Sequence, residues 1–314
     1  MDVRRTARRL APLVALAGAV AGAGLYYGHE VEPADVEVVP VELALPRLEA
    51  PFDGYRIAHV SDLHADGWMT PGRVLKLVEL VNARAPDLVV ITGDFATYSL
   101  LHGPRIHHIP KLAAPLRRLR APDGVLAVLG NHDHKTDDGV PQRALGDVRK
   151  EHDVPETVRR ALAAAGVTEL RNTVHTPRRG KAALHLCGVD SAYWDEDRLG
   201  SVLEELPERG AAVLLVHEPD FAERSAASGR FDLQLSGHSH GGQVRLPLLG
   251  PPLLPRLGRR YPGGLYRVKV MLLYTNRGLG NHPRLRLNCR PEITLLTLCS
   301  PSTRNKPRQE PSPA

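Results

Sequence analysis

Short apolar segments, each ending at a group of polar residues, recur along most of this chain. Five of them have the length and the Val, Leu, Ile and Ala content of buried strands. These predicted strands are 56–60, 87–91, 125–129, 211–216 and 231–235. The polar residues follow each strand directly, which is typical of an open α/β sheet at the edge where ligands bind. The pattern therefore predicts a layered domain with a site at the carboxyl ends of its strands.

Two segments between these strands have the periodicity of amphipathic helices. In the first, Thr70 is a suitable N-cap and Pro71 fits the first helical position. The second covers 155–165, and Gly166 follows it as a typical helix stop. Further strands are indicated at 183–189, 267–274 and 292–298. Their partly polar alternation favours an antiparallel region, so we expect an α/β (α+β) fold in which helices flank a β-sandwich.

The amino terminus has the features of a targeting segment. Four arginines precede an uncharged run from Leu10 to Gly28, which consists mostly of Ala, Val, Leu and Gly. A helix of that length spans a hydrocarbon core of about 30 Å, so residues 1–28 are expected to be a signal anchor or a cleaved signal peptide. The arginines predict that the rest of the chain lies outside the cytoplasm, membrane-anchored or exported. Their pairing also leaves twin-arginine export open.

Composition marks the borders of the folded body. Residues 29–52 are acidic and contain several prolines, and we expect a linker with an edge strand near 36–39. Residues 300–314 are rich in Pro, Ser and charge, so a disordered tail is expected there. The segment between them, 53–299, is long enough for one domain with a sizeable core.

The net charge of +6 is distributed unevenly along the chain. From Leu233 to Pro291 there are ten Arg and Lys residues and no Asp or Glu, so the body before this stretch is acidic overall. The basic stretch favours an anionic partner. Only 4% of the residues are aromatic, which offers little for base stacking and makes nucleic acid the weaker choice. No obligate protein partner is inferred.

The three cysteines do not indicate a disulfide framework or a zinc finger. Cys187, Cys289 and Cys299 are too few for the first and lack the spacing of the second. A bridge between Cys289 and Cys299 stays open.

The polar residues after the five strands have the ligand chemistry of a metal site. Asp62 and His64 are two positions apart at a strand end and therefore face the same side. Asp94 follows Gly93, which permits a sharp turn. The other candidate ligands are Asn131, His217, His238 and His240. Seven nitrogen and oxygen ligands without Cys exceed the needs of one tetrahedral zinc and suit two ions that share a carboxylate.

This ordered set of motifs resembles that of the calcineurin-like metallophosphoesterases. The matching motifs are Asp62-X-His64, Gly93-Asp94, Gly130-Asn131-His132-Asp133, His217 and Gly237-His238-Ser239-His240. The resemblance covers about residues 53–299, which makes this segment the expected catalytic domain. The following Gly241-Gly242-Gln243 is similar to that of a branch of membrane-anchored or exported phosphodiesterases. That branch includes enzymes that cleave the pyrophosphate of UDP-2,3-diacylglucosamine.

The resemblance implies a centre with two divalent ions, Mn, Zn or Fe. It implies that one ion is held by Asp62, His64, Asp94 and His240, and the other by Asp94, Asn131, His217 and His238. A hydroxide that bridges the ions is then expected to attack phosphorus in line. Asp94, which both ions share, counts among the catalytic residues.

His132 is implied to be the second catalytic residue. It resembles the family histidine that stabilises the developing charge on the phosphoryl group and protonates the leaving oxygen. Asp133 is expected to support the loop. His134 and Arg245 are weaker candidates for contacts with the substrate.

The expected activity is that of a dinuclear metal-dependent phosphoesterase. We expect a phosphodiesterase that acts on an anionic, lipid-linked phosphoester or pyrophosphate, at a membrane reached through the N-terminal segment. Two alternatives stay open: a nuclease-type phosphodiesterase, and a non-catalytic metal-binding protein of the same fold. The complete ligand set together with His132 argues against the second.

Residues 246–255 form an apolar, proline-rich stretch soon after the last candidate ligand. Its prolines exclude a helix, and its backbone groups would be left unpaired in a core, so we expect it at the surface beside the site. Arg256, Arg259 and Arg260 follow it, a combination that suits a lipid interface. Alternatively, its leucines cover the edge of a sheet.

Overall fold

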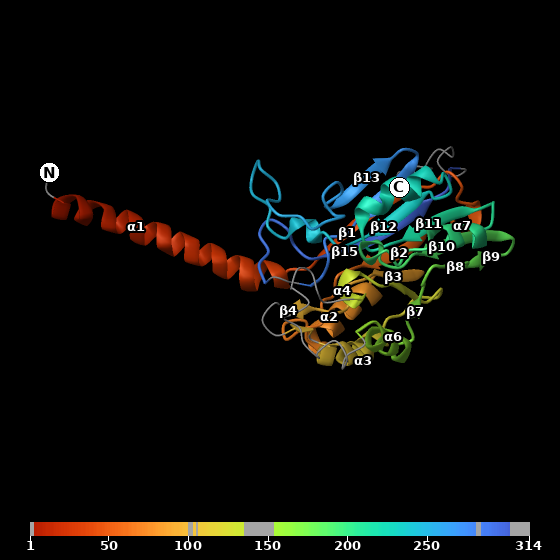
Figure 1. Cartoon of the computed structure of the whole chain (residues 1–314), viewed down its shortest axis with the longest axis horizontal. Coiled ribbons are helices and arrows are strands. Elements are labelled where there is room, and N and C mark those ends of the chain that lie inside the picture. Colours follow the sequence, from red (N-terminus) through yellow and green to blue (C-terminus); the bar gives the residue numbers. More distant parts are fainter. Residues whose placement is uncertain (1–2, 100–102, 105, 135–153, 281–283, 302–314) are drawn as a thin grey trace, which may run out of the picture.

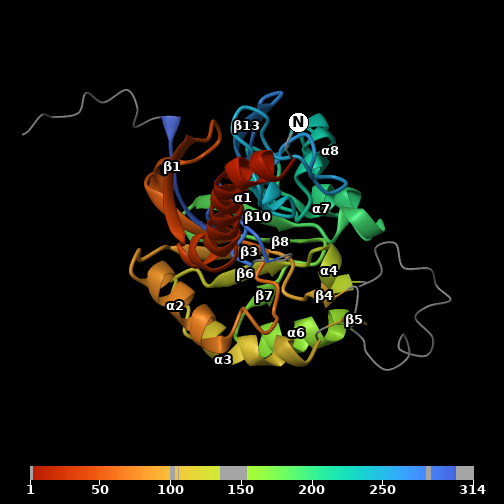
Figure 2. The same ribbon diagram turned by 90° about the vertical axis from the view of Figure 1, so that its left-hand side faces the viewer.

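The computed structural model describes residues 3–99, 103–104, 106–134, 154–280 and 284–301 (Figure 1). Two β-sheets lie face to face, and helices cover the outer face of each. Figure 2 shows α2, α3 and α6 on one side of the sheets and α7 and α8 on the other. This is the helix-flanked β-sandwich that the sequence predicts. All but the first two residues of the expected tail, 300–314, lie outside the described part of the chain.

The first sheet contains three of the five predicted strands. Its order is β1-β15-β2-β3-β6-β7. The strands are β1 (Glu37–Ala44), β2 (Tyr55–Val60), β3 (Leu88–Thr92), β6 (Val125–Val128), β7 (Thr168–Glu169) and β15 (Glu292–Cys299). Because β2, β3 and β6 are parallel, their carboxyl ends lie at one edge of the sheet. The sheet ends at β1, which pairs with β15 alone.

The second sheet contains the other two of the five predicted strands, 211–216 and 231–235. Its order is β13-β14-β12-β11-β10-β8, and β9 pairs with β10. The strands are β8 (Thr173–His175), β9 (Arg178–Arg179), β10 (Ala182–Gly188), β11 (Ala211–Leu215), β12 (Leu233–Ser236), β13 (Gly264–Val268) and β14 (Met271–Thr275). The prediction of one strand at 267–274 is wrong. Lys269 has a positive φ of 53°, and the chain turns there into an antiparallel pair. A separate two-stranded sheet joins β4 (Tyr98–Ser99) and β5 (Gly103–Pro104).

The helices lie on the outer faces, apart from α1 and α4. They are α1 (Val3–Tyr26), α2 (Pro71–Asn82), α3 (Ala113–Leu116), α4 (Asn131–His134), α6 (Val154–Ala164), α7 (Leu199–Glu205) and α8 (Ala222–Ala227). Both predicted helices are confirmed. The Thr70 hydroxyl accepts a hydrogen bond from the backbone N–H of Arg73 at 3.4 Å, and Gly166, with φ of 72°, follows the end of α6.

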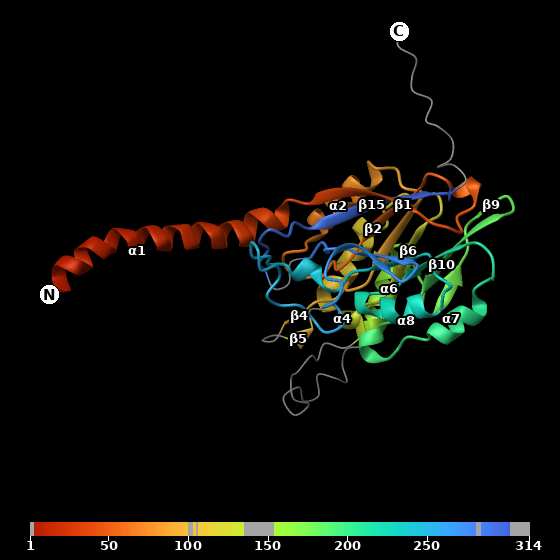
Figure 3. The same ribbon diagram turned by 90° about the horizontal axis from the view of Figure 1, so that it is seen from above.

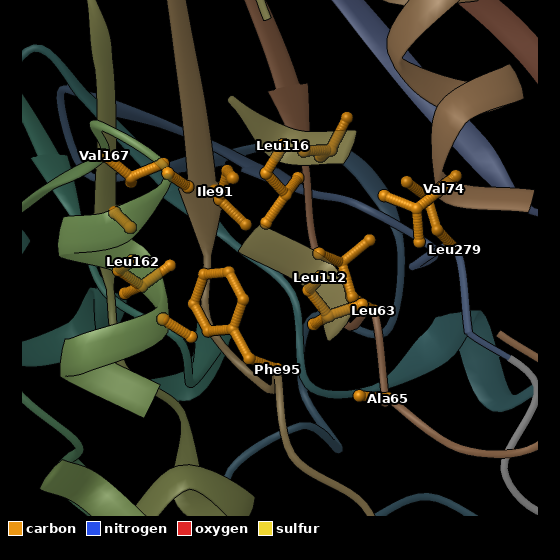
Figure 4. Close-up of a cluster of buried hydrophobic side chains, with 14 of the residues drawn as sticks. Leu63, Ala65, Val74, Ile91, Phe95, Leu112, Leu116, Leu162, Val167 and Leu279 are labelled. Atoms are coloured by element: carbon orange, nitrogen blue, oxygen red, sulfur yellow. The ribbon is translucent and has the colours of Figure 1, made fainter. Parts of the chain in front are cut away.

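Three apolar layers hold the sandwich together. Along β3, Leu88 and Val90 pack between the sheets, whereas Val89 and Ile91 pack against the helices. Figure 4 shows the helix-side cluster, in which Phe95 lies among Ile91, Leu112 and Leu162. A fully buried side chain of this size contributes about 1.5–3 kcal/mol. Phe95 is therefore a firm anchor for the residue before it, the candidate ligand Asp94.

Helix α1 extends away from the folded body (Figures 1 and 3). Among the described residues, no helix has both the length and the apolar character to cross a membrane. This finding does not support the expected signal anchor.

All three cysteines are free, so the bridge between Cys289 and Cys299 is not formed.

Candidate metal centre

Polar side chains from five strand ends meet between the two sheets. Asp62, Asp94, His217 and His238 each stand two positions beyond the end of their strand, and Asn131 begins α4 just after β6. His64 and His240 follow two positions after the first ligand of their motifs. All seven predicted ligands are buried, with no more than 7% of any residue exposed. Burial of so many polar groups is costly unless each one has a partner.

The ligand atoms form two adjoining groups. Asp62, His64 and His240 make one, and Asp94, His217 and His238 make the other; within each, the atoms lie within 4.8 Å of one another. Asp94 Oδ2 is 3.2 Å from His217 Nε2 in its own group and 3.6 Å from His64 Nε2 in the other. Asp94 thus lies where a shared carboxylate is expected.

Backbone carbonyls fix which ring nitrogen of three histidines faces the centre. The Nδ1–H of His64 donates to the Ala96 carbonyl at 3.0 Å, and that of His217 donates to the Thr92 carbonyl at 2.6 Å. In His238 the arrangement is reversed, because Nε2–H donates to the Arg256 carbonyl at 2.7 Å. His64 and His217 therefore face the centre with Nε2, and His238 faces it with Nδ1.

Asn131 provides an independent test of whether an ion fits. Asn131 is only 2% exposed, and its amide oxygen Oδ1 accepts no hydrogen bond from any of the described residues. A buried oxygen without a partner is costly, and an ion at the second group would supply one. Carboxylate, imidazole and amide donors without thiolate suit Mn²⁺, Zn²⁺ and Fe²⁺.

The ionisable side chains of the centre differ in the direction in which their pKa values are shifted. Burial raises the pKa of the Asp62 carboxyl to about 7, although His217 opposes this. Burial, together with the charge of His217, lowers the pKa of His238 to about 3. Burial and the nearby His64 and Arg286 hold the pKa of His240 well below its usual value. Against the effect of burial, Asp94 keeps the pKa of His217 well above its usual value. Neutral imidazoles such as His238 and His240 are in the form that binds a metal ion.

The centre opens into a pocket of about 630 Å³. His132 is half-buried in its lining, and its backbone N–H donates to Asp94 Oδ1 at 3.0 Å. Its ring stands edge-on to that of His64, with 5.1 Å between the ring centroids. The imidazole of His132 thus lies beside the predicted ligands, facing the space that a substrate would enter.

The pocket has an apolar wall, of which the sequence analysis expected only residues from 246–255 beside the site. It consists of Val244, Pro252, Leu253, Leu254, Pro255 and Leu285. Tyr193 also lines the pocket, and the Arg256 guanidinium lies 5.5 Å from the centroid of its ring. The Glu218 carboxylate holds the turn that carries Tyr193 by accepting from the Ser191 hydroxyl and the backbone N–H of Tyr193. Tyr193 belongs to none of the predicted motifs, so only the fold could place it here.

The other residues of the motifs support their loops. Asp133 accepts from the backbone N–H groups of Ala96 and Gly130, which confirms its expected position as a loop support. His134 and Arg245 are not among the residues that line the pocket. His134 Nε2 instead lies 2.5 Å from the buried Asp190 carboxylate, which also accepts from Arg171. Asp190 thus holds the His134 ring, and substrate contacts of His134 and Arg245 stay predictions.

A fully buried arginine, which the sequence analysis placed only in the basic stretch, braces the centre. The Arg286 guanidinium donates to the carbonyls of Arg277, Gly278, Gly280 and Cys289, at 2.7–3.2 Å. Its Nη2 also lies 3.4 Å from His240 Nδ1. The loop that it holds packs on the first ligand group, since the backbone N–H of Gly280 donates to the Asp62 carbonyl at 2.6 Å. Burial lowers the pKa of Arg286 to about 10, so it stays charged at neutral pH.

Comparison with known proteins agrees with these motifs. Residues 55–242 match the family model described as calcineurin-like phosphoesterase. The chain is 32% identical to the uncharacterized metallophosphoesterase YkuE of Bacillus subtilis, over 90% of this chain and 93% of that protein. It is 32% identical to the phosphodiesterase YaeI of Escherichia coli, over 88% and 93%. It is 27% identical to the UDP-2,3-diacylglucosamine pyrophosphatase LpxG of Chlamydia trachomatis, over 86% and 91%.

We predict that Arg286→Met weakens metal binding as well as the fold. Removing the guanidinium leaves several buried carbonyls without a donor, which we expect to lower the free energy of unfolding by about 3 kcal/mol. The loop behind Asp62 and His240 loosens, and the dissociation constant for Mn²⁺ rises about 10–100-fold. Urea unfolding and competition with a chelator measure the two effects.

Two further variants serve as controls for Arg286→Met. Arg286→Lys should restore part of the stability and of the metal affinity, and Arg267→Met, on the exposed face of β13, should change neither. Unchanged metal affinity in Arg286→Met would limit this residue to a structural role.

We also predict a pH-dependent coupling between His134 and Asp190. Against burial, the pair raises the pKa of His134 above 6.5 and lowers that of Asp190 below 3.8. Its contribution to stability is therefore complete between pH 3.8 and 6.5. It is lost as the pH rises through the raised pKa of His134, or falls through the depressed pKa of Asp190.

A double-mutant cycle with His134→Gln and Asp190→Asn measures this coupling by urea unfolding. We expect about 1–3 kcal/mol at pH 5.5 and clearly less at pH 9. The exposed pair Glu156 and Arg160 is the matched control and should show little coupling at either pH. A coupling that is equal at both pH values would contradict the assignment.

Proposed function

This chain belongs to the calcineurin-like phosphoesterase family and is a phosphoester hydrolase, and from this premise we propose that it is a dinuclear metal-dependent phosphodiesterase acting on an anionic, lipid-linked phosphoester or pyrophosphate. The observation that carries the proposal is the position of Asp94 between two groups of ligand atoms.

The residues at the centre are suited to hold two ions. Asp62, His64 and His240 would hold the first together with Asp94, and Asn131, His217 and His238 would hold the second together with Asp94. Two divalent ions, when bound, neutralise the charge of the phosphate and lower the pKa of water. The fixed ring orientations of His64, His217 and His238 support this assignment, because each turns one ring nitrogen toward the centre.

His132 is the residue that we assign to proton transfer. It lines the pocket beside the ligands, and the bond from its backbone N–H to Asp94 fixes its place in the turn. An imidazole in this position can donate a proton to the oxygen that leaves phosphorus. Asp94 thus has two tasks, since it also orients the turn that carries the proton donor.

The pocket wall supports a lipid-linked substrate. Leu253, Leu254 and Leu285 offer an aliphatic surface next to the ligands, and Arg256 at the same pocket offers a charge for a second anionic group. One relative of similar length is named for its action on UDP-2,3-diacylglucosamine, which carries both features. The aliphatic lining suits an acyl chain better than stacked bases, so the nuclease alternative is the weaker one. Action outside the cytoplasm is proposed on the arginine-flanked N-terminal sequence alone.

The dinuclear proposal predicts that Asp94→Asn loses both ions. Metal-stripped enzyme is reloaded with Mn²⁺, Zn²⁺ or Fe²⁺, and metal content and hydrolysis of a chromogenic phosphodiester and a phosphomonoester are measured. We expect two ions per chain and activity only after reloading, with the diester preferred. Asp94→Asn should retain less than one ion and no activity, whereas the exposed Asp195→Asn behaves as the wild type. Two ions in Asp94→Asn would refute the shared carboxylate.

The role of His132 predicts a dependence on the leaving group. His132→Ala should keep both ions but lose about 10²–10⁴ in kcat on a diester with an alkoxide leaving group. With 4-nitrophenolate, which leaves without a proton, the loss should be much smaller. His107→Ala, exposed and outside the pocket lining, is the control. An equal loss with both leaving groups would exclude proton donation, and loss of metal would make His132 a ligand.

A further inference from the structure

Residues 246–255, the apolar tip, begin with a closed turn, 246–250, and present leucines to solvent. Leu246 and Gly250 exchange both of their backbone hydrogen bonds, at 2.9 Å each. Leu248 and Leu249 lie at the end of this turn, where Leu248 is fully exposed and Leu249 is 82% exposed. The leucines therefore do not cover a sheet edge, and the expectation of a surface position is confirmed.

This exposure is costly to the folded chain. Leu248 has a φ of 66°, a left-handed backbone conformation that is uncommon for a residue with a Cβ. Leu253, further along the tip, is also 82% exposed. Strained backbone and clustered exposed leucines at one place indicate a surface that meets an apolar partner.

The tip continues into the pocket. Leu253, Leu254 and Pro255 belong to both, and Leu285 extends the same apolar surface toward the ligands. Figures 1 and 3 show this light-blue segment protruding from the body near the C-terminal end of α1. An apolar path therefore connects the outermost leucines with the metal centre.

Charge and backbone chemistry together select the partner. Arg256 and Arg259 are exposed at the base of the tip, and no described carboxylate lies within 4 Å of either guanidinium. Arg260 is paired with Glu223. Four of the ten tip residues are prolines without an N–H, and the N–H groups of Leu246 and Gly250 are already bonded. A segment with few free donors is suited to hydrocarbon, where an unpaired N–H is costly, and cations at its base are suited to anionic headgroups.

We propose that the apolar tip docks the enzyme on an anionic lipid surface, with Leu248 and Leu249 in the acyl region and the pocket mouth at the headgroups. The purpose of docking, delivery of a lipid-linked phosphoester, rests on the proposed function. The docking itself does not, and is measured without turnover.

The test compares full-length variants on vesicles of equal parts phosphatidylcholine and phosphatidylglycerol. The double variant Leu248→Ser, Leu249→Ser changes residues that lie outside the pocket lining, and should bind at least about tenfold more weakly in flotation. Arg259→Gln should lower the affinity for these vesicles but not for pure phosphatidylcholine. The matched control, Leu265→Ser with Val270→Ser, changes two exposed apolar residues of the β13–β14 hairpin and should bind as the wild type. Since all variants contain α1, its contribution is the same in each.

Three results would overturn the proposal. In the first, the tip variant binds vesicles as the wild type does. In the second, it loses turnover of a soluble chromogenic phosphodiester in proportion to binding, which would make the tip a structural loop. In the third, light scattering shows that the tip variant loses self-association while its vesicle binding persists, which would assign the surface to a second copy. A wild type that binds vesicles but hydrolyses no phosphodiester would refute the proposed function and leave the docking intact.

Discussion

Three backbone carbonyls control the metal centre, because they decide which nitrogen each histidine turns toward it. Thr92 belongs to β3 and Ala96 follows it by four residues, and their carbonyls hold His217 and His64. One strand end of the first sheet thereby orients ligands from both sheets. A rotated ring would leave a buried N–H without an acceptor and turn a proton, in place of a lone pair, toward the cation. The two-sheet sandwich is needed for this arrangement, since His217 comes from β11 in the second sheet.

The way in which the chain brings the ligands together explains which parts of the site could be predicted from the sequence. The strands that end at the ligands are continuous apolar runs, so their existence and the residues after them follow from composition and length. The backbone at the ligands could not be predicted. Five of the predicted ligands have a positive φ, namely Asp62, His64, Asp94, His238 and His240. A positive φ turns the chain sharply at a single residue. For a residue with a Cβ it persists only where surrounding contacts enforce it.

Two of those surrounding contacts involve residues that are not ligands, Gly237 within a motif and Arg286 outside all of them. Gly237 has no room for a Cβ, which would overlap the Asp62 carboxylate and the Ser61 hydroxyl. Arg286 is distant from Asp62 in the sequence, and in the charge pattern it is one of ten cations in a basic stretch. Only the fold separates it from the solvated arginines around it, by burying it completely against the loop behind the ligands. A single sequence gives no sign of such a position, because local propensity and charge are the same for a buried and an exposed arginine.

The third carbonyl connects the metal centre to the apolar tip. His238 donates to the carbonyl of Arg256, the first residue after the tip, and the next residue, Leu257, accepts through its own carbonyl from the backbone N–H of Asp220. Arg256 therefore contributes to the site twice. Its backbone carbonyl orients the ligand His238, and its side chain lies over Tyr193 in the pocket. Displacement of the tip base would alter both the aim of His238 and the shape of the pocket. The base of the tip is therefore part of the structure that orients the second ligand group, through one hydrogen bond of 2.7 Å, whereas the exposed Leu248 lies eight residues before it.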